Sequence, residues 1–213
     1  MKRTALFLAL LTLALTLLPG CTPPEEDPAA LDAKPVIYLY PEAETEVTVS
    51  LDYGGELTCV YPAFDGGASW SVTAAPDGTL TDAAGQTYNY LYWEGVSDAD
   101  YDFSEGFCVP GGDTAAFLED ALADLGLTRR EANEFIVYWL PRMEANPYNL
   151  IAFQTTAHTD HARLTVDPAP DTVLRVFMAW RSLSAPADIP PQALTAPERT
   201  GFTLVEWGGA ELS

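Results

Sequence analysis

Hydrophobic and polar positions along the chain follow a strand-like pattern, then a helical one, then a strand-like one again. In residues 46–52 the apolar side chains of Val47, Val49 and Leu51 alternate with polar ones, which is typical of a β-strand that buries one face. The strand-like segments in the first half of the chain are 35–41, 46–52, 56–61, 70–73, 79–81 and 87–94. Further strands are predicted after the helical part, at 149–154, 162–166, 173–181 and 201–207.

Two turns in the first half of the chain predict β-hairpins. Gly54 and Gly55 separate the strand patterns at 46–52 and 56–61. The sequence Pro-Asp-Gly at 76–78 separates the patterns at 70–73 and 79–81. Short glycine-containing turns commonly join antiparallel neighbours, so we expect each pair of strands to lie side by side.

The middle of the chain has the period of two consecutive helices. Residues 113–125 form the first, which ends at Gly126. Thr128 and Glu131 form a capping box for the second, whose apolar positions keep helical spacing as far as position 143. Pro141 lies inside this second pattern and lacks a backbone donor, so we expect a kink or an early end there.

The order of these elements predicts an α+β fold. We expect a mostly antiparallel sheet with the two-helix insertion packed on one of its faces. The regular alternation of strand and helix that marks a doubly wound fold is missing from the sequence. Residues 34–213 are interpreted as a single domain, because their number and the 48% hydrophobic content of the chain suffice for one core.

The first residues have the layout of a secretory signal peptide. Lys2 and Arg3 precede an apolar stretch at 5–18, which is shorter than the roughly 20 residues of a membrane-spanning helix. Residues 1–20 are therefore predicted to be removed. Residues 21–33, which are rich in proline and acidic side chains, cannot form a core and predict a flexible tether.

The residues Leu18-Pro19-Gly20-Cys21 resemble the lipobox of bacterial lipoproteins, although Pro19 stands where a small or β-branched residue is more usual. The resemblance implies that Cys21 carries a diacylglyceryl thioether and an acylated amino group, with fatty acids such as palmitate. It also implies an anchor in the cell membrane or the outer membrane, with the domain facing outside the cytoplasm. The alternative is a plain secreted protein that is cut near Gly20.

Net charge excludes several classes of partner. The chain has 31 acidic residues against ten Lys and Arg, which gives a formal net charge of −21. Binding to nucleic acid needs a basic face that neutralises phosphates, and only eight cationic residues lie outside Lys2 and Arg3. We therefore expect no nucleic acid partner and no electrostatic attachment to anionic lipid.

Three segments resemble those of a group of bacterial extracellular proteins that open in the same way. They read Lys-Pro-Val-Ile-Tyr-Leu-Tyr-Pro at 34–41, Asn-Glu-Phe-Ile-Val-Tyr-Trp-Leu-Pro at 133–141 and Asn-Pro-Tyr-Asn-Leu at 146–150. The resemblance spans nearly the whole domain. It implies one secreted bacterial domain and assigns no catalytic residue.

Two thiols remain once Cys21 is acylated. Outside the cytoplasm, Cys59 and Cys108 could form a disulfide that closes a loop of about fifty residues. The alternative is that each is a separate buried thiol, packed as a small hydrophobe. The distance between the two residues decides between these interpretations.

Two polar clusters contain the residue types of metal ligands. Asp98, Asp100 and Asp102 alternate so that several oxygens could face one Ca²⁺, although the turn glycine and final glutamate of an EF-hand are missing. His158 and His161, with Asp160 before the second, are of the types that bind Zn²⁺. The alternatives are a solvated acidic loop and a solvated turn. We expect no other cofactor.

Two acidic residues beside tryptophans are candidates for catalysis. Glu94 follows Trp93 and Glu206 precedes Trp207, and a glycosidase needs two carboxylates about 5 to 10 Å apart. The alternative is that both acids lie at strand ends while the tryptophans fill the core. Tyrosines raise a similar question at Tyr38, Tyr40, Tyr88, Tyr90 and Tyr92. If their face of the sheet is exposed, these tyrosines form a platform for glycans or peptides. If helices cover that face, the tyrosines pack in the core.

The anchor, the tether and the aromatic strands favour a membrane-anchored extracytoplasmic lipoprotein that acts as a binding or interaction module, with a glycan or an envelope protein as partner. An enzyme is less favoured, because the common catalytic sequence motifs are missing. One alternative is an envelope-associated hydrolase that acts on glycan or peptidoglycan through Glu94, Glu206 or the acidic cluster at 98–102. A second alternative is a structural helper in envelope assembly.

Overall fold

The computed structural model describes residues 30–154 and 156–212. The predicted signal peptide at 1–20, Cys21 and the predicted tether up to residue 29 lie outside these residues. In the described part of the chain, no helix is both long and apolar enough to cross a membrane. The predicted tether is too long at its C-terminal end, because residues 30–33 belong to strand β1 (Ala30–Tyr40), where Asp32 is only 1% exposed.

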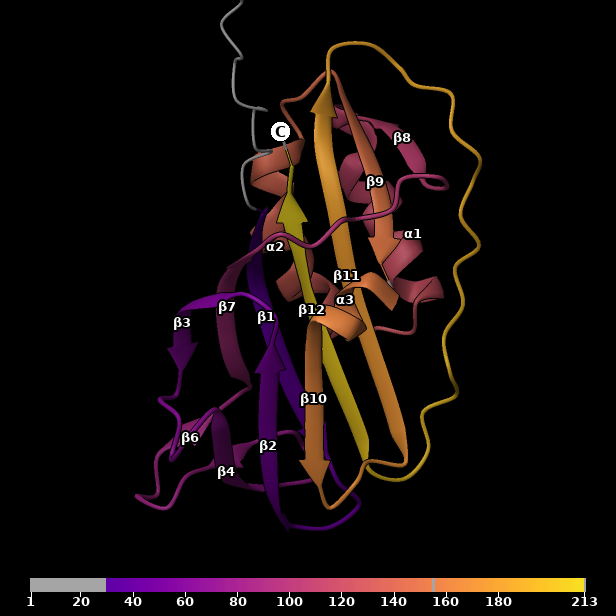
Figure 1. Ribbon diagram of the computed structural model, residues 1–213. Coiled ribbons are helices and arrows are strands. Elements are labelled where there is room, and N and C mark those ends of the chain that lie inside the picture. The colour runs from indigo at the N-terminus through magenta and orange to yellow at the C-terminus, as the bar shows by residue number, and fades with distance from the viewer. Residues whose placement is uncertain (1–29, 155, 213) are drawn as a thin grey trace, which may run out of the picture.

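A seven-stranded sheet, here called the large sheet, forms the centre of the fold (Figure 1). Its spatial order is β3 (Glu56–Tyr61), β7 (Leu91–Ser97), β1, β12 (Thr203–Glu211), β11 (Thr172–Leu183), β9 (Tyr148–Gln154) and β8 (Phe107–Pro110). Neighbouring strands are antiparallel except β11 and β12. A parallel pair needs a crossover, and residues 184–202 provide it by running past the start of β8 and the end of β9 (Figure 1).

A smaller antiparallel sheet packs on one face of the large sheet. Its spatial order is β10 (Ala162–Asp167), β2 (Thr45–Tyr53), β4 (Ser69–Ala74), β5 (Leu80–Thr81) and β6 (Thr87–Tyr88). In Figure 1, β2 and β10 lie in front of β1 and β12. The apolar face of β2, with Val47 and Val49, shares one buried core with Ile37 and Leu39 of β1.

Helices cover the opposite face of the large sheet. A 3₁₀ turn, η1 (Gly111–Asp113), leads into α1 (Thr114–Asp124), which is followed by α2 (Arg129–Met143). The predicted capping box of Thr128 and Glu131 is confirmed at the start of α2. The Phe135 ring of α2 lies 5.4 Å from that of Trp207 on β12, so the tryptophan next to Glu206 fills the core under the helices. Trp93, next to Glu94, fills the other core, between the two sheets. A third helix, α3 (Thr156–His161), precedes β10.

The predicted α+β class and the helices on one face are confirmed, but the strands form two sheets rather than one. The first predicted hairpin is wrong, because β2 joins the small sheet whereas β3 pairs with β7 in the large sheet. The glycines 54 and 55 therefore carry the chain from one sheet to the other. A turn sequence alone does not determine which sheet a strand joins; burial of the apolar face of β2 does.

The other local predictions concern β4 and α2. The second predicted hairpin is confirmed, because β4 and β5 pair in antiparallel register. Of the kink or early end predicted at Pro141, the early end is wrong, since the helix continues to Met143, and the kink stays a prediction. Pro141 lies in the last turn, where few backbone bonds depend on it, and the fully buried Met143 holds that turn against the sheet.

Candidate functional site

A group of polar and aromatic side chains, here called the tyrosine site, lies on the helix-covered face of the large sheet. The tyrosine site consists of Lys34, Tyr38, Tyr90, Tyr92, Glu94 and Glu134. Successive side chains of a strand point to opposite faces, so Tyr92 and Glu94 of β7 face away from the small sheet, while Trp93 is buried against it. Helix α2 contributes Glu134, which meets β1 through the hydroxyl of Tyr38.

Lys34 reaches the tyrosine site because β1 is irregular at this position. The pairing of β1 with both neighbours shifts between residues 32 and 36, and Lys34 has a φ of 61°, the only positive φ of a non-glycine residue in the described part of the chain. Such a backbone conformation is uncommon for lysine. It is held by a hydrogen bond from the Lys34 N–H to Oε1 of Glu94, at 3.2 Å.

The ammonium group of Lys34 lies among aromatic rings. Its Nζ is 4.8 Å from the ring centre of Tyr90 and 5.1 Å from that of Tyr92, and it is 3.3 Å from the hydroxyl of Tyr90. A cation over an aromatic face is attracted by the ring quadrupole. Lys34 is also the only lysine after residue 2, so the tyrosine site contains the only lysine ammonium group of the predicted domain.

Each carboxylate of the tyrosine site has a tyrosine partner. The hydroxyl of Tyr38 donates to Oε2 of Glu134 at 2.8 Å. Burial, followed by the hydrogen bond to Glu134, raises the pKa of Tyr38 well above its ordinary value. Burial and the neighbouring carboxylate of Glu94 also raise the pKa of Tyr92. Both hydroxyls therefore remain protonated donors at neutral pH.

The tyrosine site is partly open to solvent. Tyr90 and Tyr92 are half-buried, and Tyr61 of the edge strand β3, which is in register with Tyr92, is 60% exposed. Tyr38 is buried, and the half-buried Tyr40 continues the row along β1 with its ring parallel to that of Tyr38 at 6.1 Å. The predicted platform is therefore part core and part surface. Its remaining member, at position 88, belongs to the small sheet.

The domain has two cavities of note. One, of about 300 Å³, is lined by Tyr40, Thr128, Arg130, Arg199, Gly201 and Thr203. The other, of about 180 Å³, lies between the loop at 102–105, the start of α3 and Gln192. The first lies next to the buried Tyr38 of the tyrosine site, because Tyr40 lines it and its ring stacks on that of Tyr38.

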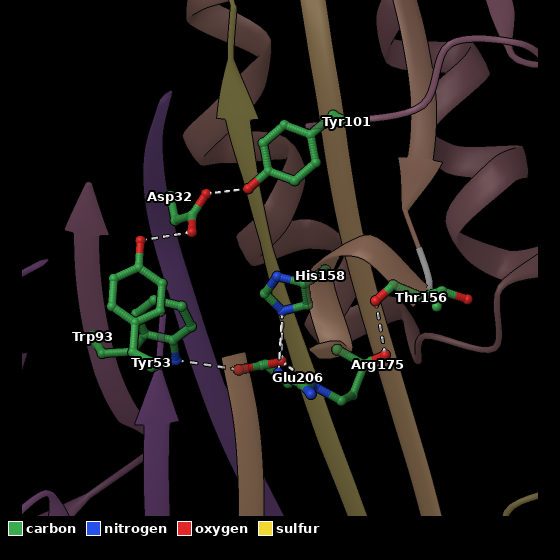
Figure 2. Close-up of polar contacts among 9 residues, drawn as sticks. Asp32, Tyr53, Trp93, Tyr101, Thr156, His158, Arg175 and Glu206 are labelled. Carbon is green, nitrogen blue, oxygen red and sulfur yellow. Dashed lines mark hydrogen bonds and ion pairs between the residues drawn. The ribbon is translucent and has the colours of Figure 1, made fainter. Parts of the chain in front are cut away.

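Glu206, the second predicted catalytic carboxylate, lies on the opposite face of the large sheet from Glu94. Its side chain is only 1% exposed, and Oε1 accepts a hydrogen bond from Nε1 of Trp93 at 3.2 Å (Figure 2). Trp93 and Glu94 are consecutive residues of β7 and point in opposite directions. The predicted pairing of Glu94 with Glu206 in one cleft is therefore wrong.

The Glu206 carboxylate belongs to a buried ion cluster with Arg175 and His158 (Figure 2). Nε of Arg175 is 2.5 Å from Oε2, and Nε2 of His158 is 3.1 Å from the same oxygen. Burial by itself would raise the pKa of Glu206, but Arg175 and His158 outweigh it and lower the pKa to about 2. The cluster joins β12, β11 and α3, and its burial indicates a structural role.

His158 and His161 have different surroundings on α3. The ring of His158 is 2% exposed and stacks between Phe177, at 4.0 Å, and Trp93, at 6.3 Å. The predicted solvated turn is therefore wrong for His158. The ring of His161 packs edge-on against Tyr53 at 5.3 Å. Within residues 30–154 and 156–212, no three His, Cys, Asp or Glu side chains are grouped as a metal site would require.

Asp32 forms a second buried polar centre, above the ion cluster in Figure 2. The hydroxyl of Tyr53 donates to its Oδ2 at 2.8 Å, and that of Tyr101 donates to Oδ1. Burial raises the pKa of Asp32, although these two hydrogen bonds act in the opposite direction. Because Asp32 lies two residues before Lys34, these bonds fix β1 at the beginning of its irregular segment.

The acidic cluster lies on the loop between β7 and β8. Asp98 and Asp100 are exposed, and the carboxylate of Asp102 accepts hydrogen bonds from the backbone and hydroxyl of Ser104 at 2.7 and 2.9 Å. The side chain of Asp102 thus stabilises the turn of its own loop. Calcium binding at these three aspartates stays a prediction.

Cys59 and Cys108 are both free thiols. Cys59 lies on β3 and Cys108 on β8, which are the two edge strands of the large sheet. Six strand spacings of about 4.8 Å separate these edges by roughly 29 Å. Of the two alternatives, a disulfide within one chain is therefore wrong, since it needs Cα atoms within about 7 Å. The alternative of two buried thiols is wrong for Cys59, which is exposed.

The sequence interpretation missed Lys34 and Glu134 as members of a site. Neither belongs to a motif with a known chemical role, and 99 residues separate them in the chain, as their numbers show. The available signal was indirect, because both lie in segments, 34–41 and 133–141, for which a resemblance to one group of bacterial extracellular proteins was an expectation from the sequence. Only the packing of α2 beside β1 brings these segments together.

Comparisons with known proteins identify a relative in Butyrivibrio fibrisolvens. This "Uncharacterized protein in bglA 3'region" is 44% identical to the chain over 96 residues, which cover 45% of the chain and 99% of the relative. No protein-family model matches the chain. No solved structure matches it either. The chain therefore belongs to the same protein family as this Butyrivibrio fibrisolvens protein.

Proposed function

We propose that the chain is a membrane-anchored lipoprotein whose extracytoplasmic domain binds a glycan at the tyrosine site. The observation that carries this proposal is the convergence of Lys34, half-exposed tyrosine rings and two carboxylates on an open part of the large sheet. Aromatic faces stack on the apolar faces of sugars, while charged groups bind hydroxyls. This combination favours a glycan over a purely apolar ligand.

The tyrosine site is well suited to recognition because its polar groups are already oriented. Glu134 is held by the Tyr38 hydroxyl, and the Lys34 backbone by Glu94. Side chains that are ordered before binding lose little conformational entropy when a ligand arrives. A sugar on the Tyr90 and Tyr92 rings would meet both a cation and an acceptor.

A glycan panel that includes peptidoglycan fragments tests this proposal with the full-length chain. We expect Tyr92→Ala to weaken binding at least about tenfold, as for a central aromatic residue of an interface. Tyr148→Ala is the matched control, because Tyr148 is also half-buried but lies on β9, away from the site. Equal binding by the two variants, or no binding to any glycan, would contradict the proposal.

The lipid anchor has its own test. In metabolic labelling, a palmitate analogue should become attached to the wild-type chain and not to the Cys21→Ser variant. Mass spectrometry should show that the mature chain begins at Cys21. The Cys21→Ser variant should also leave the membrane fraction. A membrane-bound but unlabelled chain would refute acylation at this residue.

Hydrolysis is a second candidate function, because Glu94 and Glu134 both border the tyrosine site. Two carboxylates on one site are the minimum for glycoside hydrolysis. Release of reducing ends from a bound glycan, abolished by Glu134→Gln, would favour an envelope hydrolase over a binding module. Binding without such release would favour the module.

A further inference from the structure

The cavity of about 300 Å³ continues the tyrosine site along β1. Tyr40 is shared between them, since its ring lines the cavity and stacks on that of Tyr38. The other side chains around the cavity belong to Thr128, Arg130, Arg199 and Thr203. All of them carry hydrogen-bond donors, and two are guanidinium groups. A glycan chain that lies on the tyrosine rings and follows β1 would enter this cavity.

Arg130 keeps most of its binding capacity. Its side chain is 65% exposed, and the nearest carboxylate, that of Glu134, is 4.0 Å from its Nε. Glu134 already accepts the hydrogen bond from Tyr38 at 2.8 Å. An ion pair with this geometry at the surface is weak, so a ligand can compete for the guanidinium of Arg130.

Arg199 neutralises the acidic side chain next to the cavity. Its Nη2 and Nη1 are 2.6 and 3.2 Å from the two carboxylate oxygens of Glu131. The Nε–H of Arg199 has no acceptor among the described residues. The first turn of α2 does not contribute a site of its own, because Thr128 and Glu131 already cap it. The exposed positive charge at the cavity therefore comes from Arg130.

We propose that the glycan at the tyrosine site is acidic and that the carboxylate of one of its uronic acid units lies in this cavity against Arg130. This inference rests on the proposed function. A guanidinium matches the planar carboxylate and can bind both oxygens. In a chain with a net charge of −21, a carboxylate is otherwise repelled, so this local arginine also selects where the acidic unit lies.

The test compares trigalacturonate with its methyl ester, in which methyl groups remove the negative charges, as ligands of the full-length chain. We expect the acid to bind about five- to tenfold more tightly than the ester, with the difference shrinking at high salt. Arg130→Gln should abolish this preference. The matched control is Arg129→Gln, since Arg129 is the preceding residue of α2 and pairs instead with Glu119 at 2.7 Å.

The outcomes separate this inference from the proposed function. Equal affinity for acid and ester, or a preference that survives Arg130→Gln, overturns the carboxylate subsite while glycan binding stands. Binding of neutral glycans but of neither galacturonate ligand also overturns the subsite alone. If no glycan binds at all, both the proposed function and the subsite fail.

Discussion

Replacing Glu206 by glutamine removes the negative charge from the buried ion cluster and leaves Arg175 without a counter-charge. The carboxylate is completely buried, with Arg175 at 2.5 Å and His158 at 3.1 Å. Burial would raise its pKa, but the two neighbours lower it to about 2, against 4.5 for an unperturbed glutamate. That difference corresponds to roughly 3 kcal/mol of folding stability.

The pH dependence of this stabilisation has a definite sign. Because the pKa of Glu206 is lower in the folded chain than in the unfolded chain, the stabilisation is fully present above pH of about 5.5 and is lost as the pH falls towards 2. We expect Glu206→Gln to lower the free energy of unfolding by about 3 to 5 kcal/mol at pH 7. The difference between wild type and variant should be smaller by about 2 kcal/mol near pH 3 than at pH 7.

Urea unfolding followed by tryptophan fluorescence at several pH values between 7 and 3 measures this difference. Trp93 donates a hydrogen bond to Glu206, so its emission also reports the local change. Glu211→Gln is the control, because Glu211 ends the same strand but is exposed. The reasoning would be refuted if Glu206→Gln lowered the free energy of unfolding by the same amount at every pH, or by no more than Glu211→Gln does.

Three further predictions concern stability and the thiols. Glu131→Ala should lower the free energy of unfolding by about 3 kcal/mol in urea titrations, because it removes both the α2 capping box and a buried ion pair. Gly78→Ala should lower the free energy of unfolding by about 1 to 3 kcal/mol in the same titrations, since the φ of Gly78 is +88° and the new Cβ would lie 2.6 Å from the Tyr40 ring. An unchanged free energy of unfolding would contradict this. Alkylation and mass spectrometry without reductant should find Cys59 and Cys108 both free, and Cys59 should react faster because it is exposed; a Cys59–Cys108 peptide would contradict the fold.

Much of the local structure could be predicted from the sequence. The capping box of Thr128 and Glu131, the β4–β5 hairpin and the strands after residue 148 depend on neighbours only a few positions away. Their periodicity and turn residues therefore carry the information directly. α3 was missed because six residues with both histidines have no apolar period to detect.

The tyrosine site was only partly predictable. Glu94 was a candidate from the sequence because it follows a tryptophan, and the tyrosines were candidates because they recur at every second position. Lys34 was not, since its direction depends on a register shift that involves two neighbouring strands. Glu134 was not, since it comes from a helix on another part of the chain.

The sequence by itself determined the class of the fold and the position of most elements, because period and turn residues are local properties. Only the tertiary structure decided which strands share a sheet and which face each side chain joins. A side chain one position along a strand changes face, so Trp93 packs with Glu206 while Glu94 joins Lys34. The same geometry places Cys59 and Cys108 at opposite edges of the large sheet, a separation that no spacing in the sequence could reveal.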